Sequence, residues 1–342
     1  MLTAEKIKQY AKACGADLVG IGSMDRFEGA PLQMDPRYIM PEGKSIIGLG
    51  FRIHRGLLRG IEEGTFFAGY PAMGYANIND VYAPMVLREV GNLLEDEGYE
   101  ALLYQNTSVR LGSGAGQAVS PDKPRPDVFL HFRIAGFICG MGEIGWSKVF
   151  LTPQFGPRQR LAFILTDAPL EPDPLFEGGL CDRCMSCVRE CPAGAISETK
   201  SVKVTVAGRE LEWNALDTYK CGIVFQTGAP QYGPFLTDEA KAVVQDVIDG
   251  VPEKETKIGQ TYPGGVNAYV REQVAFTKRT WDSYHHPGAM DGARGCIRAC
   301  MMHLESRGVL ENKFHNKFRQ RKPWSLGGLP DGAAGEEPDK EA

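Results

Sequence analysis

The sequence predicts a mixed α/β (α+β) protein of two domains, from three observations. Helical and strand periodicities alternate through the first half of the chain, which is typical of helices layered against a sheet. The proline-rich stretch Asp167–Pro174 then breaks this pattern and predicts a domain boundary near residue 172. A run of closely spaced cysteines opens the second domain, residues 173–310. The 342 residues are enough for two domains of ordinary size.

The elements of the first domain, residues 1–172, follow from periodicity. In chain order they are a helix around Ile7–Cys14, strands at Leu18–Gly22 and Ser45–Phe51, a Gly/Tyr/Pro-rich loop at 64–75, an amphipathic helix over Asn79–Glu97, and strands at Tyr99–Tyr104 and Leu161–Thr166. Cys14 is interpreted as a core thiol of the first helix. The stretch 105–127 is glycine- and proline-rich, so we expect a long functional or mobile loop there.

Glycines at 140, 142 and 145 have the spacing of a dinucleotide-binding turn. Such a turn needs a strand before it and a helix after it, whereas a short strand-like run, Trp146–Pro153, follows here. We therefore interpret these glycines as positions where the backbone approaches another group closely. Arg158 and Arg160 precede the strand Leu161–Thr166, and both a surface role and a site role fit them.

The cysteine run of the second domain has the spacing of bacterial ferredoxins. Cys181, Cys184, Cys187 and Cys191 are separated by two, two and three residues, and Pro192 follows directly. This spacing gives three thiolates to one cubane cluster and the fourth to another. Structural zinc usually takes two separated cysteine pairs, and a disulfide framework belongs to secreted proteins, so both alternatives fit less well.

Three further cysteines complete most of a two-cluster ligand set: Cys221, Cys296 and Cys300. In two-cluster ferredoxins the last cysteine of each run binds the cluster of the other run. This exchange assigns Cys300 to the cluster of Cys181, Cys184 and Cys187. Cys191, Cys221 and Cys296 are left for the second cluster. The eighth position is occupied by Ala293. The second cluster therefore has a non-cysteine ligand, an open iron or a three-iron form; the candidate ligands are His285, His286 and Asp291.

A helical insertion is predicted at about 225–290, between Cys221 and Cys296. Its helices are expected at Asp238–Asp249 and at Asn267–Trp281, with Asn267 as N-cap. Residues 311–342 form a basic segment followed by a Gly/Pro/Glu tail, which we expect to be disordered.

Charge and hydropathy limit the classes of partner. A net charge of −5 gives no basic footprint for nucleic acid. No apolar run is long enough to span a bilayer, and the first residues predict an amphipathic helix and a strand, not a signal peptide. We expect a cytoplasmic protein without membrane contact, in which the nine cysteines stay reduced.

Taken in order, several motifs resemble those of the superfamily of epoxyqueuosine reductases and reductive dehalogenases. They are Asp17-Leu-Val-Gly-Ile, Ala135-Gly136 leading into Gly142-Glu-Ile-Gly145, Leu151-Thr-Pro-Gln-Phe-Gly-Pro-Arg158, Leu165-Thr-Asp167 and the cysteine run. The resemblance covers roughly residues 1–225 and resumes at Cys296.

The resemblance implies a nitroreductase-like first domain that holds cobalamin, and a ferredoxin-like domain whose two 4Fe-4S clusters pass single electrons to it. Reduced ferredoxin or flavodoxin is the implied donor. Gly142, Gly145 and Arg158 are the implied contacts of the corrinoid. The implied catalytic candidates are Tyr104, Asp127 and Arg160, because the dehalogenases use a tyrosine assisted by a basic side chain and the epoxide reductases an aspartate.

The chain also departs from both groups. It has only a short basic end where epoxyqueuosine reductases have a helical-repeat tail for tRNA, and no twin-arginine signal near Met1. We therefore predict an iron–sulfur oxidoreductase that reduces, or removes a leaving group from, a small organic molecule. Two rivals stay open: an accessory protein that transfers electrons to a corrinoid enzyme, and a tRNA epoxyqueuosine reductase with a shortened tail.

Overall fold

The computed structural model describes residues 2–59, 63–106, 116–231, 233, 236–273, 295–311 and 314–318, without the side chains of 271–273. Among these residues no helix combines the length and apolar character needed to cross a membrane.

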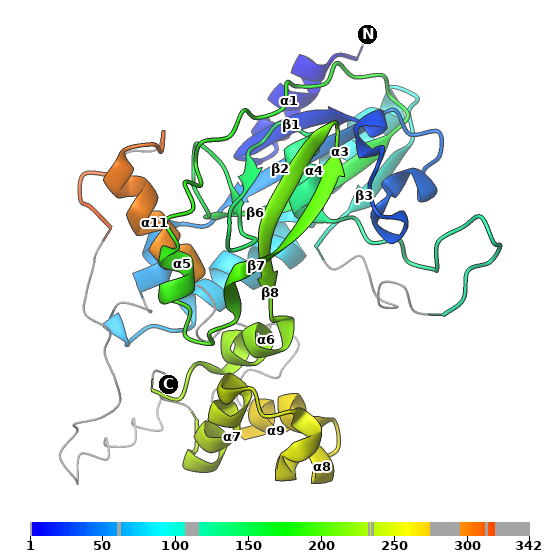
Figure 1. The fold of residues 1–342 in the computed structure, drawn as a ribbon. Coiled ribbons are helices and arrows are strands. Elements are labelled where there is room, and N and C mark those ends of the chain that lie inside the picture. The colour runs from blue at the N-terminus through cyan, green and yellow to red at the C-terminus, as the bar shows by residue number, and fades with distance from the viewer. Residues whose placement is uncertain are drawn as a thin grey trace, which may run out of the picture.

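A four-stranded sheet forms the centre of the first domain (Figure 1). Its strands, in spatial order, are β1 (Leu18–Ser23), β2 (Ser45–Arg52), β6 (Gln159–Thr166) and β3 (Ala101–Tyr104). Every neighbouring pair is antiparallel. The predicted strands are confirmed within one or two residues at their ends, and so is the mixed α/β class.

The two faces of the sheet bury different helices. Ala162 and Ile164 of β6 belong to a core that includes α1 (Ala4–Ala13) and α3 (Ala83–Asp96). Phe163 lies between these two residues in β6 and points to the other face of the sheet. It belongs to a second core, which contains α4 (Phe132–Ile138). This alternation is the period of two expected for a strand buried on both faces.

Glycines in β1 and β2 let the end of α4 approach the sheet. A Cβ at Gly20 would lie 2.3 Å from the carbonyl oxygen of Cys139, and one at Gly48 would lie 2.7 Å from the sulfur of Met141. Because the Cys139 oxygen belongs to the backbone, a side chain at position 20 would displace the turn after α4, whereas the Met141 side chain near Gly48 is flexible. That turn leads into the motif at Gly142.

The segment before α3 corrects one expectation. The predicted loop at 64–75 instead contains a π-helix, Tyr70–Ala76, and a second one, Ile78–Tyr82, leads into α3. Tyr70 and Ile78 are buried in the core beneath them. Burial of these side chains favours a helical path over an open loop, in spite of the glycines and the proline.

A β-hairpin not predicted from the sequence packs across the first domain (Figure 1). It consists of β7 (Ile196–Val206) and β8 (Arg209–Leu216). Ala207 and Gly208 form its turn with φ of 51° and 69°, the backbone that a two-residue hairpin turn requires. Trp213 is only 4% exposed and lies in the core beside α4. The hairpin therefore joins the cysteine region to the first domain.

The last described helix, α11 (Cys296–Arg307), lies beside α5 (Ser186–Arg189) of the cysteine run (Figure 1). Met301 and Leu304 of α11 are fully buried in the core of α1 and α3. The helix that carries the last two cysteines is thus anchored on the first domain. The short β4 (Glu143–Ile144) and β5 (Phe150–Leu151) form a second contact with the cysteine region.

The insertion has a core of its own at one end of the molecule (Figure 1). Its helices are α6 (Thr218–Thr227), α7 (Asp238–Asp249), α8 (Lys257–Thr261) and α9 (Gly265–Gln273). The prediction for α7 is confirmed to the residue. The expected N-cap at Asn267 is wrong, because α9 begins two residues earlier and Glu253 accepts the backbone N–H of Val266 at 2.8 Å. The predicted end at Trp281 lies outside the described residues.

Candidate functional site

The first group of thiols consists of three cysteines of the run and Cys300 of α11. Burial raises the pKa of Cys300 well above its usual value, and the charges of Cys181, Cys187 and Cys184 raise it further. Burial and the same neighbours raise the pKa of Cys187 to about 11. Four thiols that disfavour one another's ionisation need a cationic centre to become thiolates together.

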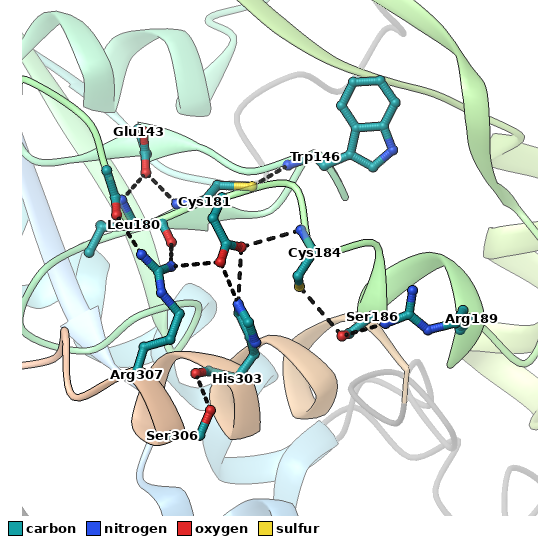
Figure 2. A network of polar contacts seen from close by, with 12 residues as sticks. Glu143, Trp146, Leu180, Cys181, Cys184, Ser186, Arg189, His303, Ser306 and Arg307 are labelled. Carbon is teal, nitrogen blue, oxygen red and sulfur yellow. Dashed lines mark hydrogen bonds and ion pairs between the residues drawn. The ribbon is translucent and has the colours of Figure 1, made fainter.

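The cysteine loop is held by a residue of β4 (Figure 2). The Glu143 carboxylate accepts the backbone N–H groups of Leu180 at 2.6 Å and Cys181 at 2.7 Å. The backbone N–H of Trp146 donates to Cys181 Sγ at 3.3 Å, and the Ser186 hydroxyl lies 3.4 Å from Cys184 Sγ. Hydrogen bonds to sulfur are one of the means by which a protein sets the potential of an iron–sulfur cluster.

Asp182 connects this loop to two residues of α11, His303 and Arg307. Its carboxylate lies 2.8 Å from His303 Nε2 and 3.4 Å from the Arg307 guanidinium. The ligand atoms of Asp182, Cys184 and His303 lie within 4.8 Å of one another, close enough to share a metal ion. Since Cys184 also belongs to the first group of thiols, this trio borders the same centre.

The second group contains Cys191, Cys221 of α6 and Cys296 of α11. Burial raises the pKa of Cys296 to about 12, with further contributions from Cys221 and Cys191. Burial and the charge of Cys191 also raise the pKa of Cys221. Cys296 and Cys300 are one turn apart on α11, so the two groups are adjacent. The roles of all seven thiols as ligands stay predictions, and their grouping fits two clusters side by side.

The proposed eighth ligand cannot be placed. Ala293, His285, His286 and Asp291 all lie outside the described residues.

A cavity of about 400 Å³ adjoins the second group. The three cysteines form part of its wall, and the rest comes from the first domain and α6. Aromatic side chains make up much of this wall: Tyr70, Tyr75, Phe132, Phe150 and Phe225. A volume of this size suits a small organic molecule.

Three cationic side chains also line the cavity: Arg133 of α4, Lys148 of the β4–β5 turn and Arg160 of β6. The Arg160 guanidinium lies 4.3 Å from the centre of the Tyr75 ring and donates to Asn79 Oδ1 at 3.0 Å. The described residues of the wall include no aspartate or glutamate. The cavity therefore combines an apolar body with a positive potential.

The structure separates the three catalytic candidates. Arg160 lines the cavity beside the cysteines, whereas Tyr104 and Asp127 line another cavity of about 490 Å³. The Tyr104 hydroxyl donates to the Val128 carbonyl at 3.3 Å and accepts the Leu130 N–H at 3.2 Å, so it braces the segment before α4.

The three predicted corrinoid contacts lie within the fold of the first domain. A Cβ at Gly142 would lie 1.9 Å from the Leu151 carbonyl oxygen, and Gly145 faces the Leu151 side chain. The expected close approach is thus to the chain's own β5. Arg158 is 2% exposed and donates to the Ile53 carbonyl, so its guanidinium supports the loop after β2.

Sequence reasoning missed Glu143, Arg133, Lys148 and Tyr75. Glu143 was part of the motif at Gly142, where only the glycines were interpreted. Lys148 has φ of +64°, a conformation unusual for lysine, and no sequence pattern indicates it. Arg133 and Tyr75 come from elements whose inward faces only the tertiary structure defines.

Comparisons with known proteins give sequence relatives, whereas no protein-family model matches the chain. A tetrachloroethene reductive dehalogenase of Desulfitobacterium hafniense is 43% identical over 69 residues, which are 19% of this chain and 12% of that protein. Epoxyqueuosine reductase of Escherichia coli is 29% identical over 213 residues, 58% of this chain and 54% of that enzyme. The chain thus matches a small part of the dehalogenase and about half of the epoxyqueuosine reductase.

Among solved structures, an epoxyqueuosine reductase with a tRNA stem loop aligns over 89% of this chain and 82% of its own, at 16% identity and a TM-score of 0.46. A catabolic reductive dehalogenase aligns over 87% of this chain and 38% of its own, at 20% identity and a TM-score of 0.45. The resemblance seen in the motifs is confirmed by the sequence relatives: the chain is a relative of the epoxyqueuosine reductases and the reductive dehalogenases.

Proposed function

We propose that the protein is an iron–sulfur oxidoreductase that delivers electrons singly, through two clusters, to a small organic substrate in the 400 Å³ cavity. One observation carries the proposal: seven thiols from three separate parts of the chain gather in two adjacent groups, and the second group forms part of the cavity wall. Electrons that arrive at the second group are then next to the substrate. The sequence relatives, which are reductases, support this reading.

The donor set fits iron–sulfur clusters. Cys181, Cys184, Cys187 and Cys300 would hold the first cluster, and Cys191, Cys221 and Cys296 the second. The clusters would supply low-potential electrons one at a time. We infer that reduced ferredoxin or flavodoxin delivers these electrons and that the protein works in the cytoplasm.

The reaction we propose exchanges a leaving group for hydrogen. The substrate takes up two electrons and one proton, and the leaving group departs with the electron pair of its bond. Tyr75 and Arg160 lie in the cavity as a tyrosine and a basic partner. We therefore assign the proton to the Tyr75 hydroxyl, with Arg160 as the neighbouring basic side chain. Tyr104 and Asp127 line the other cavity and are less well placed for this step.

Cobalamin is part of the proposal through the family resemblance. The described residues of the cavity wall enclose a space that suits a small substrate. When bound, the corrinoid would supply a strongly reducing centre beside the second cluster. Gly142, Gly145 and Arg158 make contacts within the chain, so other residues must hold a corrinoid.

Anaerobic purification followed by metal analysis and spin-resonance spectroscopy tests the proposal. We expect about seven to eight iron atoms per chain, two reducible clusters and cobalt after reconstitution with cobalamin. Iron-free protein would refute the electron relay. Iron without cobalt would refute only the corrinoid.

Reduction of an epoxide is a second candidate, because the longer sequence matches are to epoxyqueuosine reductases. Analysis of tRNA nucleosides from a deletion strain tests it. Accumulated epoxyqueuosine would favour this candidate, and an unchanged nucleoside profile would exclude tRNA as substrate. The third reading, an accessory electron-transfer protein, requires a stable complex with a corrinoid enzyme and no turnover of small molecules.

A further inference from the structure

The charges in the cavity beside the second thiol group are one-sided. Arg133, Lys148 and Arg160 line it, and the described part of its wall contains no carboxylate. Neither the Arg133 guanidinium nor the Lys148 amine makes a hydrogen bond or ion pair with another described residue. Grouping like charges in a partly buried space is unfavourable unless an anion joins them.

The three cations affect one another through Arg133. Burial lowers the pKa of Arg133, and the charge of Arg160 lowers it further. Burial and the charge of Arg133 likewise lower the pKa of Lys148. The site therefore holds positive charge at an energetic cost, which is a mark of binding sites more than of structural ones.

The thiols balance only part of this charge. The charges of Cys296 and Cys221 raise the pKa of Arg133, so a negatively charged cluster held by these cysteines would neutralise part of its charge. Lys148 has φ of +64°, which costs about 1 kcal/mol for a residue other than glycine. The backbone N–H of Lys148 donates to the Gly145 carbonyl at 2.8 Å, so the β4–β5 turn sets this conformation and holds the lysine at the cavity wall.

We propose that this cavity binds a small organic anion, with its carboxylate or phosphate among Arg133, Lys148 and Arg160 and its apolar body against the aromatic wall. The Arg160 guanidinium has five N–H donors, of which Nε donates to Asn79 and Nη2 donates to Asn106, and the others suit carboxylate and phosphate oxygens. Tyr75 and Phe132 would contact the body of the ligand. The inference that this anion is the substrate rests on the proposed function, whereas the binding step needs no turnover.

Isothermal titration of the anaerobically reconstituted full-length protein tests the site with matched probes. Benzoate and phenyl phosphate carry the charge, and benzamide has the shape of benzoate without it. We expect the anions to bind at least about tenfold more tightly than benzamide. Lys148→Gln and Arg160→Gln should each weaken benzoate binding about tenfold and leave benzamide binding unchanged. Arg160→Lys should restore part of the loss.

The control variant is Arg88→Gln on α3, whose side chain is 72% exposed and pairs with Glu89. It removes the same charge from the surface and should not alter benzoate binding. Iron content and reducible absorbance are measured on every sample, so loss of the clusters is distinguished from loss of the anion site. Equal binding of benzoate and benzamide, no anion binding below about 10 mM, or unchanged benzoate affinity in both Lys148→Gln and Arg160→Gln would overturn the proposal. Anion binding by iron-free protein would uphold the site and refute the oxidoreductase.

Discussion

The Glu143 carboxylate accepts the backbone N–H of Cys181 at 2.7 Å, and this bond joins β4 of the first domain to the first residue of the cysteine run. The same oxygen accepts the N–H of Leu180 at 2.6 Å. Two buried backbone donors thus depend on one side chain. This contact helps to set the position of the first thiol group relative to the sheet.

Replacement of Glu143 by alanine should loosen the loop that carries Cys181. Two N–H groups would lose a charged acceptor, which we expect to cost about 1–3 kcal/mol of unfolding free energy. Iron content should fall by about half if only the first cluster is affected. Denaturant unfolding and iron analysis measure these effects. Glu42→Ala, at an exposed position, is the control and should change neither quantity.

Replacement of Cys300 by serine should remove the first cluster and leave the second. Its thiol lies with those of the run, so the spin-resonance signal of one cluster should vanish and about four iron atoms per chain should be lost. Cys14→Ser at the end of α1 is the matched control. Equal iron in the Cys300 variant and the control would contradict the ligand assignment.

Gly142 should tolerate no side chain. Because a Cβ there would lie 1.9 Å from the Leu151 carbonyl oxygen, Gly142→Ala must displace β5 and should cost about 3 kcal/mol or more. Gly56→Ala adds the same atom in open space and should have little effect. Thermal unfolding of the two variants measures the difference. Similar melting temperatures would show that the β4–β5 contact is unimportant.

His131 should make stability depend on pH. Burial, followed by the charges of Arg133 and Lys148, lowers its pKa from 6.5 to about 3. Between these two values the unfolded chain binds a proton that the folded protein does not. The contribution is therefore fully present above pH 6.5, and stability falls as the pH drops towards 3, by at most about 1.4 kcal/mol per pH unit.

The variant His131→Asn tests this dependence. His131 Nδ1 accepts the Ile134 N–H at 3.3 Å as the N-cap of α4, and asparagine can also cap a helix without titrating in this range. Denaturant unfolding between pH 4 and pH 7 should show a shallower slope in the variant. An identical slope would exclude His131 as the cause.

Much of the fold follows from local sequence. The strands β1, β2 and β6 are predictable because each is a short, largely buried apolar run, and α7 is predictable because its buried residues recur at helical spacing. The β7–β8 hairpin also has a local signal, because residues of alternating polarity flank the turn at Ala207-Gly208. The π-helices before α3 were not predictable from propensity, because burial of Tyr70 and Ile78 outweighs the glycines and proline around them.

The sequence by itself determined the cysteine spacing, and with it the kind of centre to expect, since ligand geometry within one loop depends on neighbours in the chain. The ferredoxin pattern also predicted that Cys300 joins the run and that Cys296 joins Cys221, and the tertiary structure brings these thiols near one another through α11. Only the tertiary structure brought Arg133, Lys148 and Arg160 to one cavity from a helix, a turn and a strand. Such convergence is set by how the elements pack, because side chains far apart in sequence meet only after the cores have formed.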